Sequence, residues 1–312
     1  MTFCRFLPFR HLACLLMAWL AWPVQAVDVR FVSVVPGVFA HIGDTGPRSI
    51  SNEGLNANIG LIDTPQGAIL IDSGATHRSA ADIHAAARRV TVQPIKWVIN
   101  TGGQDHRWLG NAYFASQGAQ IMAHEAARMD MQARGGDRVA TLTAALKDLA
   151  AGTLPVLPTR WLSGPDSVLE LGGVRLALRH RGGGHTPGDL LVELPERGVV
   201  FSGDLVYVDR LLGVIPVSST RAWLEAFAAL EALAPSVIVP GHGQVTTLAV
   251  AQAQTRDYLR ALRSHMKKAV DDNVDISQAI KTFDASRWAA LLNAAELLPG
   301  NASRTYLELE RE

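Results

Sequence analysis

Apolar and polar residues alternate along the chain in short runs that predict many β-strands and several amphipathic helices. Apolar runs that stop at glycine, proline or aspartate indicate strands. The expected strands cover 29–35, 38–42, 56–63, 67–72, 97–99, 120–123, 168–171, 174–180, 190–194, 199–201 and 237–239. Helices are expected at 78–89, 109–116, 124–150 with an interruption at 135–136, 221–233, 248–272, near 276, and from about 303.

The order of these elements predicts the fold class. Each half of the chain gives strands, then a helix, then a strand. This order favours an α/β protein in which two β-sheets pack face to face and helices cover both outer faces. We expect one domain over 27–247 and a helical C-terminal extension, 248–312, packed on it.

The N-terminus has the pattern of a secretory signal. Arg5 and Arg10 precede an apolar run at 12–22, and small residues follow at 24–26. The run is too short for a comfortable bilayer span. We therefore expect residues 1–26 to be a removed signal peptide and the mature chain to be periplasmic, with an uncleaved anchor as the alternative.

Composition narrows the chemistry that the mature chain can carry. Lys plus Arg and Asp plus Glu are equal, at 29 each, which argues against a nucleic-acid or membrane-surface partner. Both cysteines, Cys4 and Cys14, lie inside the predicted signal. The mature chain would have no thiol, which excludes cysteine nucleophiles, disulfides and thiolate ligands. Any bound metal must be held by nitrogen and oxygen.

Residues of the metal-ligand type follow the ends of four predicted strands. Asp105 and His106 follow the first, His185 lies in Gly-Gly-Gly-His-Thr-Pro-Gly-Asp, Asp204 in Ser-Gly-Asp, and His242 in Pro-Gly-His-Gly. Glycine allows positive φ and close approach of the backbone, and strand ends support a site rigidly. Together these side chains predict a common metal site.

The order of these motifs resembles the metallo-β-lactamase-fold hydrolases, from about residue 29 to residue 242. The resemblance implies a four-layer αββα sandwich with a centre of one or two metal ions at the edge of the sheets. It also implies ligand roles. Asp105, His106 and His242 would bind one metal, Asp204 would reach that metal and bridge to a second where one exists, and His185 would belong to the other metal.

The chain departs from this family in its first metal loop. The usual loop reads His-any-His-any-Asp-His, and alignment on Asp105 and His106 places Thr101 and Gly103 at the two leading histidines. We therefore expect a site for one ion, most simply zinc, although nitrogen and oxygen ligands would also accept iron or manganese.

The predicted one-metal site consists of Asp105, His106, Asp204 and His242. His185 either joins this set or hydrogen-bonds a substrate, and we expect it to be catalytic. Asp105 would orient the attacking water or take its proton if it is not fully committed as a ligand.

Two further residues of the loop are candidates for substrate binding. Gln104 could also ligate weakly through its amide oxygen. For Arg107, one interpretation is an exposed salt bridge, and the other is a cation that holds an anionic group of the substrate. Trp108 is expected in the core.

The variant loop and the C-terminal segment 301–310 look closest to the zinc metallohydrolases of periplasmic quinoprotein relay systems. We expect a hydrolase that acts on an ester, thioester, lactone or lactam-like bond of a small molecule, with a quinoprotein dehydrogenase as its partner. The alternative is a non-catalytic accessory protein that binds a metal or a ligand. The missing histidines argue against a β-lactamase proper.

Overall fold

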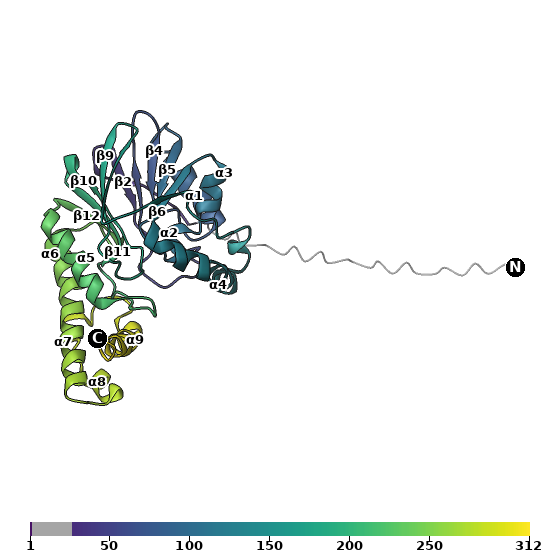
Figure 1. Cartoon of the computed structure of the whole chain (residues 1–312). Helices are drawn as coiled ribbons and strands as arrows, with labels where there is room; N and C mark the ends of the chain where they lie inside the picture. The colour runs from purple at the N-terminus through teal and green to yellow at the C-terminus, as the bar shows by residue number, and fades with distance from the viewer. Residues whose placement is uncertain (2–26) are drawn as a thin grey trace.

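Two mixed β-sheets with helices outside them form the part of the chain that the computed structural model describes, residue 1 and residues 27–312 (Figure 1). The strand order is β1-β2-β3-β4-β5-β6-β7 in one sheet and β12-β11-β10-β9-β8 in the other. This architecture confirms the predicted fold class. The predicted signal peptide, with Cys4 and Cys14, lies outside the described residues apart from Met1.

The first sheet contains β1 (Val32–Val35), β2 (Val38–His41), β3 (Ile59–Ile62), β4 (Ala68–Ile71), β5 (Ile95–Ile99), β6 (Gln120–His124) and β7 (Arg160–Leu162). The second contains β8 (Asp166–Leu171), β9 (Val174–Arg179), β10 (Leu191–Leu194), β11 (Val199–Tyr207) and β12 (Val237–His242). The helices are α1 (His77–Ala87), α2 (Asp105–Trp108), α3 (Asn111–Ser116), α4 (Arg128–Leu146), α5 (Thr220–Leu233), α6 (Leu248–Ala251), α7 (Asp257–Asp271), α8 (Ile276–Thr282) and α9 (Ala294–Leu309).

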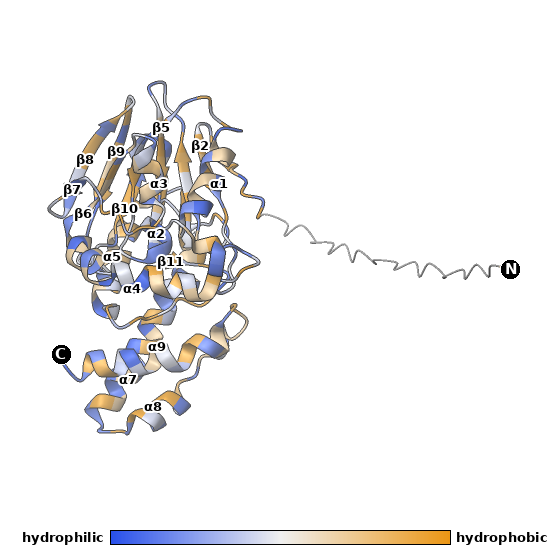
Figure 2. Cartoon of the chain, turned by 90° about the vertical axis from the view of Figure 1, so that its right-hand side faces the viewer, coloured by the Kyte–Doolittle hydropathy of each residue, from blue (hydrophilic) through white to orange (hydrophobic). Residues whose placement is uncertain are grey.

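Successive side chains of a strand point to opposite faces of the sheet, so the apolar side chains of one strand contribute to two separate cores. In β4, Ile69 and Ile71 face the second sheet, and Ala68 and Leu70 face the opposite way, where α1 packs. Both faces of this strand are buried, so its sequence is apolar throughout. The strands form the apolar centre of the molecule in Figure 2.

The C-terminal helices share a core with the outer face of the second sheet. Ile238 of β12 and Phe227 of α5 belong to the same apolar cluster as Tyr258 and Leu262 of α7 and Tyr306 of α9. Figure 2 shows α7, α8 and α9 beyond the end of the sandwich. Among the described residues, no helix combines the length and apolar character needed to cross a bilayer.

Several predicted boundaries were wrong. The α4 helix runs without a break through Gly135. A Cβ at this position would lie 2.9 Å from Pro155, so the glycine serves close packing and does not end the helix. The last helix begins at Ala294 rather than near residue 303, and a π-helical turn, Gln252–Arg256, interrupts the predicted helix 248–272. The strand β7 was not predicted.

Candidate metal centre

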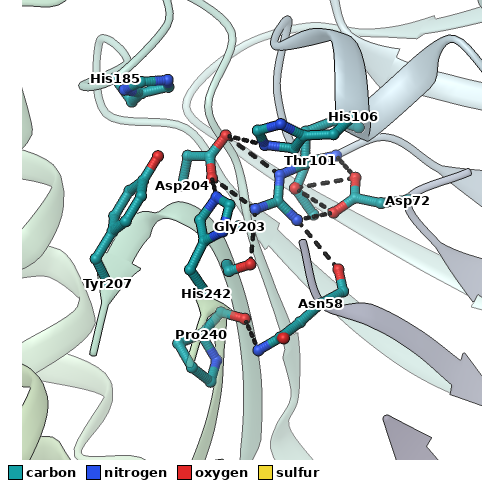
Figure 3. A network of polar contacts seen from close by, with 12 residues as sticks. Asn58, Asp72, Thr101, His106, His185, Gly203, Asp204, Tyr207, Pro240 and His242 are labelled. Atoms are coloured by element: carbon teal, nitrogen blue, oxygen red, sulfur yellow. Dashed lines mark hydrogen bonds and ion pairs between the residues drawn. The ribbon is translucent and has the colours of Figure 1, made fainter. Parts of the chain in front are cut away.

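Three of the predicted ligands meet at one point. One ligand atom from each of His106, Asp204 and His242 lies within 4.8 Å of the others, and all three residues are buried. His106 Nε2 is 3.1 Å from Asp204 Oδ2, and His242 Nε2 is 3.1 Å from Asp204 Oδ1 (Figure 3). They come from the α2 helix and from the β11 and β12 strands, which pair in parallel.

Asp204 and His242 do not follow their strands as predicted, but lie within them. All nine residues of β11 are buried, so the strand continues past Gly203 instead of turning there. Its register against β12 shifts on both sides of Gly203. Such irregularities re-aim side chains at the edge of a sheet.

Asp105 lies outside this group. Its buried carboxylate pairs with Arg48 and accepts a hydrogen bond of 2.8 Å from the backbone N–H of His106. Neighbouring residues in a helix point about 100° apart, so Asp105 and His106 at the start of α2 do not face the same point. However, Asp105 Oδ1 is 3.5 Å from His106 Nδ1, the nitrogen that faces away from Asp204. Asp105 is therefore placed to orient His106 through its charge, without a hydrogen bond to the ring, and it does not join the three ligand atoms.

This placement predicts a measurable effect of Asp105→Asn on metal affinity. Carboxylates that orient a ligating histidine typically contribute 10–100-fold to affinity, so we expect binding to weaken by roughly that factor. Competition against a chelator would measure it, with Asp166→Asn, at an exposed ion pair, as the control. Unchanged affinity would contradict the orienting role, and complete loss of the metal would make Asp105 a ligand.

Arg107 is the largest departure from expectation. Its side chain is only 1% exposed, so the exposed salt bridge is wrong. Nε and Nη2 donate to the two oxygens of Asp204 at 3.2 and 2.5 Å, and Nη1 donates to Asp72 at 2.9 Å. The remaining N–H groups donate to backbone carbonyls, those of Asn58 at 3.1 Å and Gly241 at 3.0 Å. All five guanidinium donors are used, which leaves none for a substrate.

The contacts of Arg107 also change how the metal loop is aligned with the family pattern. His106 and Arg107, not Asp105 and His106, are the neighbours that reach Asp204. If the pattern is shifted by one residue toward the C-terminus, His106 and Arg107 occupy its final Asp and His positions. Gly102 and Gln104 then occupy the positions of its two leading histidines. Gln104 accepts a hydrogen bond of 3.1 Å from Arg138.

The space at the leading positions is already filled. A Cβ on Gly102 would lie 2.6 Å from Asp189, and one on Gly103 would lie 2.8 Å from Asp130. Thr101, which takes a leading position in the original alignment, donates a hydrogen bond to Asp72. These residues do not supply a second set of ligands.

The ionisation of the group suits a divalent cation. Burial raises the pKa of Asp204, but the charge of Arg107 and the contacts with both imidazoles outweigh burial and hold that pKa well below its usual value. Burial lowers the pKa of His106 and lowers that of His242 further. At neutral pH the group is a carboxylate and two neutral imidazoles.

These residues fit one metal ion. Neither His106 Nδ1 nor His242 Nδ1 has a hydrogen-bond partner, while each Nε2 faces a carboxylate oxygen. The lone pairs of each Nε2 and of the facing carboxylate oxygen would repel each other. Either a proton on each ring or one cation shared by all three residues must therefore lie between them. Two histidines and one carboxylate, with a position left open, are a typical set for a catalytic zinc.

His185 lies outside the three-residue group, and the structure defines its tautomer. Its Nδ1 is 2.8 Å from the carbonyl oxygen of Gly213, which can only accept, so Nδ1 carries the proton. Burial lowers the pKa of His185 to about 4, so the ring is neutral at physiological pH. Its Nε2 is therefore an unprotonated acceptor.

Sequence reasoning missed Tyr207 and Asp72. Tyr207 stacks on His242 with ring centroids 4.6 Å apart and lies 5.9 Å from the ring of His185. It was missed because the strand was expected to end at residue 201. Asp72, the second carboxylate on Arg107, directly follows β4, which pairs with β5, and a polar residue at the carboxyl end of an adjacent parallel strand was the available signal.

Comparison with known proteins agrees with the motif order. Residues 52–242 match the family model for the metallo-β-lactamase superfamily. A metallo-β-lactamase from Pontibacter korlensis is 21% identical, with a TM-score of 0.59, over 74% of this chain and 99% of that one. The mono-zinc form of FIM-1 from Pseudomonas aeruginosa is 22% identical, with a TM-score of 0.56, over 75% of this chain and 96% of that one. Because the family model covers more than half of its length, the chain belongs to the metallo-β-lactamase superfamily.

Proposed function

We propose that this protein is a hydrolase that uses a single metal ion, most simply zinc. The observation that carries the proposal is the buried group of His106, Asp204 and His242, whose ligand atoms lie within 4.8 Å of one another. The fold is that of metal-dependent hydrolases. Iron and manganese would also suit this donor set.

In this proposal His106, Asp204 and His242 hold the ion. A zinc ion held there would lower the pKa of a bound water molecule toward ~7 and would polarise the bond to be broken. Arg107 keeps Asp204 ionised and fixes both of its carboxylate oxygens. Trp223 and Tyr207 pack around His185 and limit access of bulk water to its ring.

The role that we assign to His185 is general base. Its Nδ1–H is held by Gly213, so its Nε2 is free to take a proton from the attacking water and later return it to the leaving group. Tyr207 brings a buried hydroxyl to the same side of the site, where it can donate a hydrogen bond to a substrate oxygen (Figure 3).

We propose that the substrate is a small molecule with an ester, thioester, lactone or lactam-like bond. A periplasmic location rests on the signal-like pattern of residues 1–26 and the absence of cysteine after residue 14. An association with a quinoprotein dehydrogenase rests on the resemblance of the loop and the C-terminal segment alone.

The metal content of the purified chain tests the proposal. We expect about one zinc, iron or manganese ion per chain by mass spectrometry, and near-complete loss of that ion in His106→Ala and His242→Ala. Hydrolysis across an ester, thioester and lactone panel should disappear on chelation and return with the metal. His265→Ala, at a distant partly buried histidine that contacts the Ala279 carbonyl, is the control. Turnover by metal-free protein would end the proposal.

A non-catalytic binding protein is the second candidate, and Arg107 is the observation that favours it. Both Asp204 oxygens already accept hydrogen bonds from this arginine, so the group could persist as a polar network without an ion. That function predicts no turnover of any bond in the same panel, with or without added metal.

A further inference from the structure

The C-terminal helix α9 reaches the loop that holds His185. Asn301, which is 1% exposed, accepts a hydrogen bond of 2.7 Å from the backbone N–H of Val214. Its amide nitrogen donates to the carbonyl of Leu212 at 2.8 Å and contacts the Tyr258 hydroxyl at 3.0 Å. Asn301 therefore fixes the two residues on either side of Gly213.

Gly213 is the residue whose carbonyl contacts His185 Nδ1. A Cβ placed on Gly213 would meet nothing within 4 Å, so little packing holds this residue directly. Its position depends on its neighbours, and both neighbours are tied to Asn301. Arg304, one turn further along α9, adds a hydrogen bond of 2.8 Å to the Val214 carbonyl.

The same loop also holds the backbone around His185. The Ser218 hydroxyl donates to the His185 carbonyl at 2.8 Å, and the Ser219 N–H donates to the Gly184 carbonyl at 2.9 Å. The loop thus contacts both the ring and the backbone of this histidine. A shift of the loop would release the Nδ1 contact, and an isolated imidazole exchanges readily between its two neutral tautomers.

We infer that Asn301 is a positioning residue for the active site, because it holds Gly213 where its carbonyl selects the tautomer of His185 that leaves Nε2 bare. An asparagine suits this position because it accepts from one backbone group and donates to another, which neither aspartate nor leucine can do. α9 lies beyond residues 52–242, the part that matches the family model. The catalytic consequence rests on the proposed function, but the effect on the tautomer does not.

Long-range ¹H–¹⁵N NMR of the imidazoles in the full chain tests the inference. His185→Gln identifies the His185 signals. In the unmodified protein we expect one tautomer, protonated at Nδ1, and in Asn301→Ala we expect the two ¹⁵N shifts to move toward each other as the tautomers mix. Tyr306→Phe is the matched control, because it removes a partly buried hydrogen bond of α9 to the Val274 carbonyl without touching the loop.

Arg304→Met provides a second variant if Asn301→Ala does not fold, and it should mix the tautomers to a smaller extent. If the chain is a hydrolase, kcat in Asn301→Ala should fall roughly 10-fold to 100-fold with metal content unchanged. A tautomer shift without any turnover in the parent protein would support the positioning role and count against the proposed hydrolase. An unaltered Nδ1–H signal in folded Asn301→Ala, or in folded Arg304→Met, would overturn the inference.

Discussion

Arg107→Leu is expected to lower the free energy of unfolding by about 3–5 kcal/mol, the usual cost of breaking a buried ion pair by removing one partner. The guanidinium is 1% exposed and pairs with two carboxylates, Asp72 and Asp204, that are 2% and 1% exposed. Leucine would leave both of these without their cation, and the carbonyls of Asn58 and Gly241 without a donor. Urea unfolding monitored by circular dichroism would measure the change.

Two comparisons separate this cause from a general loss of packing. Lys268→Gln removes an exposed ion pair to Asp272 and should leave the free energy of unfolding almost unchanged. Adding Asp72→Asn to Arg107→Leu removes one of the uncompensated carboxylates and should recover part of the lost stability. If Arg107→Leu is as stable as the parent protein, the buried charges are compensated by something other than this arginine.

The fold was predictable because it depends on patterns that are local in the sequence. Strands such as β4 are apolar on both faces, and the glycine, proline and aspartate residues that end most of them are visible directly. Asp204 and His242 were expected just past the ends of their strands, but both lie within them. Their strands run further than predicted because burial outweighs the turn tendency of Gly203 and Gly241.

The details of the site were less predictable because they depend on side-chain direction and on contacts distant in sequence. Asp105 and His106 looked like equivalent ligands, and only the turn of α2 separates them. Nothing near Arg107 in the sequence indicates its pairing with Asp72 and Asp204, which are 35 and 97 residues away. The missing leading histidines and a positive charge next to an expected metal ligand were the available signs that the loop had changed its role.

The contribution of the C-terminal extension was also invisible in the sequence. Its apolar spacing predicted packing surfaces, and α7 and α9 do share a core with α5. The same spacing contains no sign that Asn301 contacts a loop almost 90 residues earlier. A polar residue that is fully buried in a helix identifies its partners only once the tertiary structure is known.

His185→Gln is expected to lower kcat by roughly 10²–10⁴-fold, the usual contribution of a general base. Glutamine is of similar length and can donate an amide N–H to the Gly213 carbonyl, so the loop should stay in place. It has no basic nitrogen to take a proton from water. Because His185 is not among the three ligand residues, metal content should remain at about one ion per chain. Steady-state kinetics on any substrate from the hydrolysis panel would measure the change.

His180→Gln is the matched control for this substitution. His180 also contacts a backbone carbonyl through Nδ1, that of Asp189 at 3.0 Å, but its ring stacks on His124 instead of lying beside the metal centre. We expect its kcat to stay within a few-fold of the parent value. Equal losses in both variants would mean that the loop, and not a proton transfer by His185, limits the reaction.

The pH dependence of the parent enzyme gives an independent measurement of the same role. Burial lowers the pKa of His185 to about 4, so Nε2 stays unprotonated, and kcat should not fall through loss of this base until the pH approaches that value. The lowered pKa also makes the free energy of unfolding depend on pH. The unfolded chain, with a histidine pKa of about 6.5, binds more protons than the folded one below that pH. His185 should therefore destabilise the fold progressively as the pH falls from about 6.5 toward 4, and His185→Gln should remove that part of the acid sensitivity.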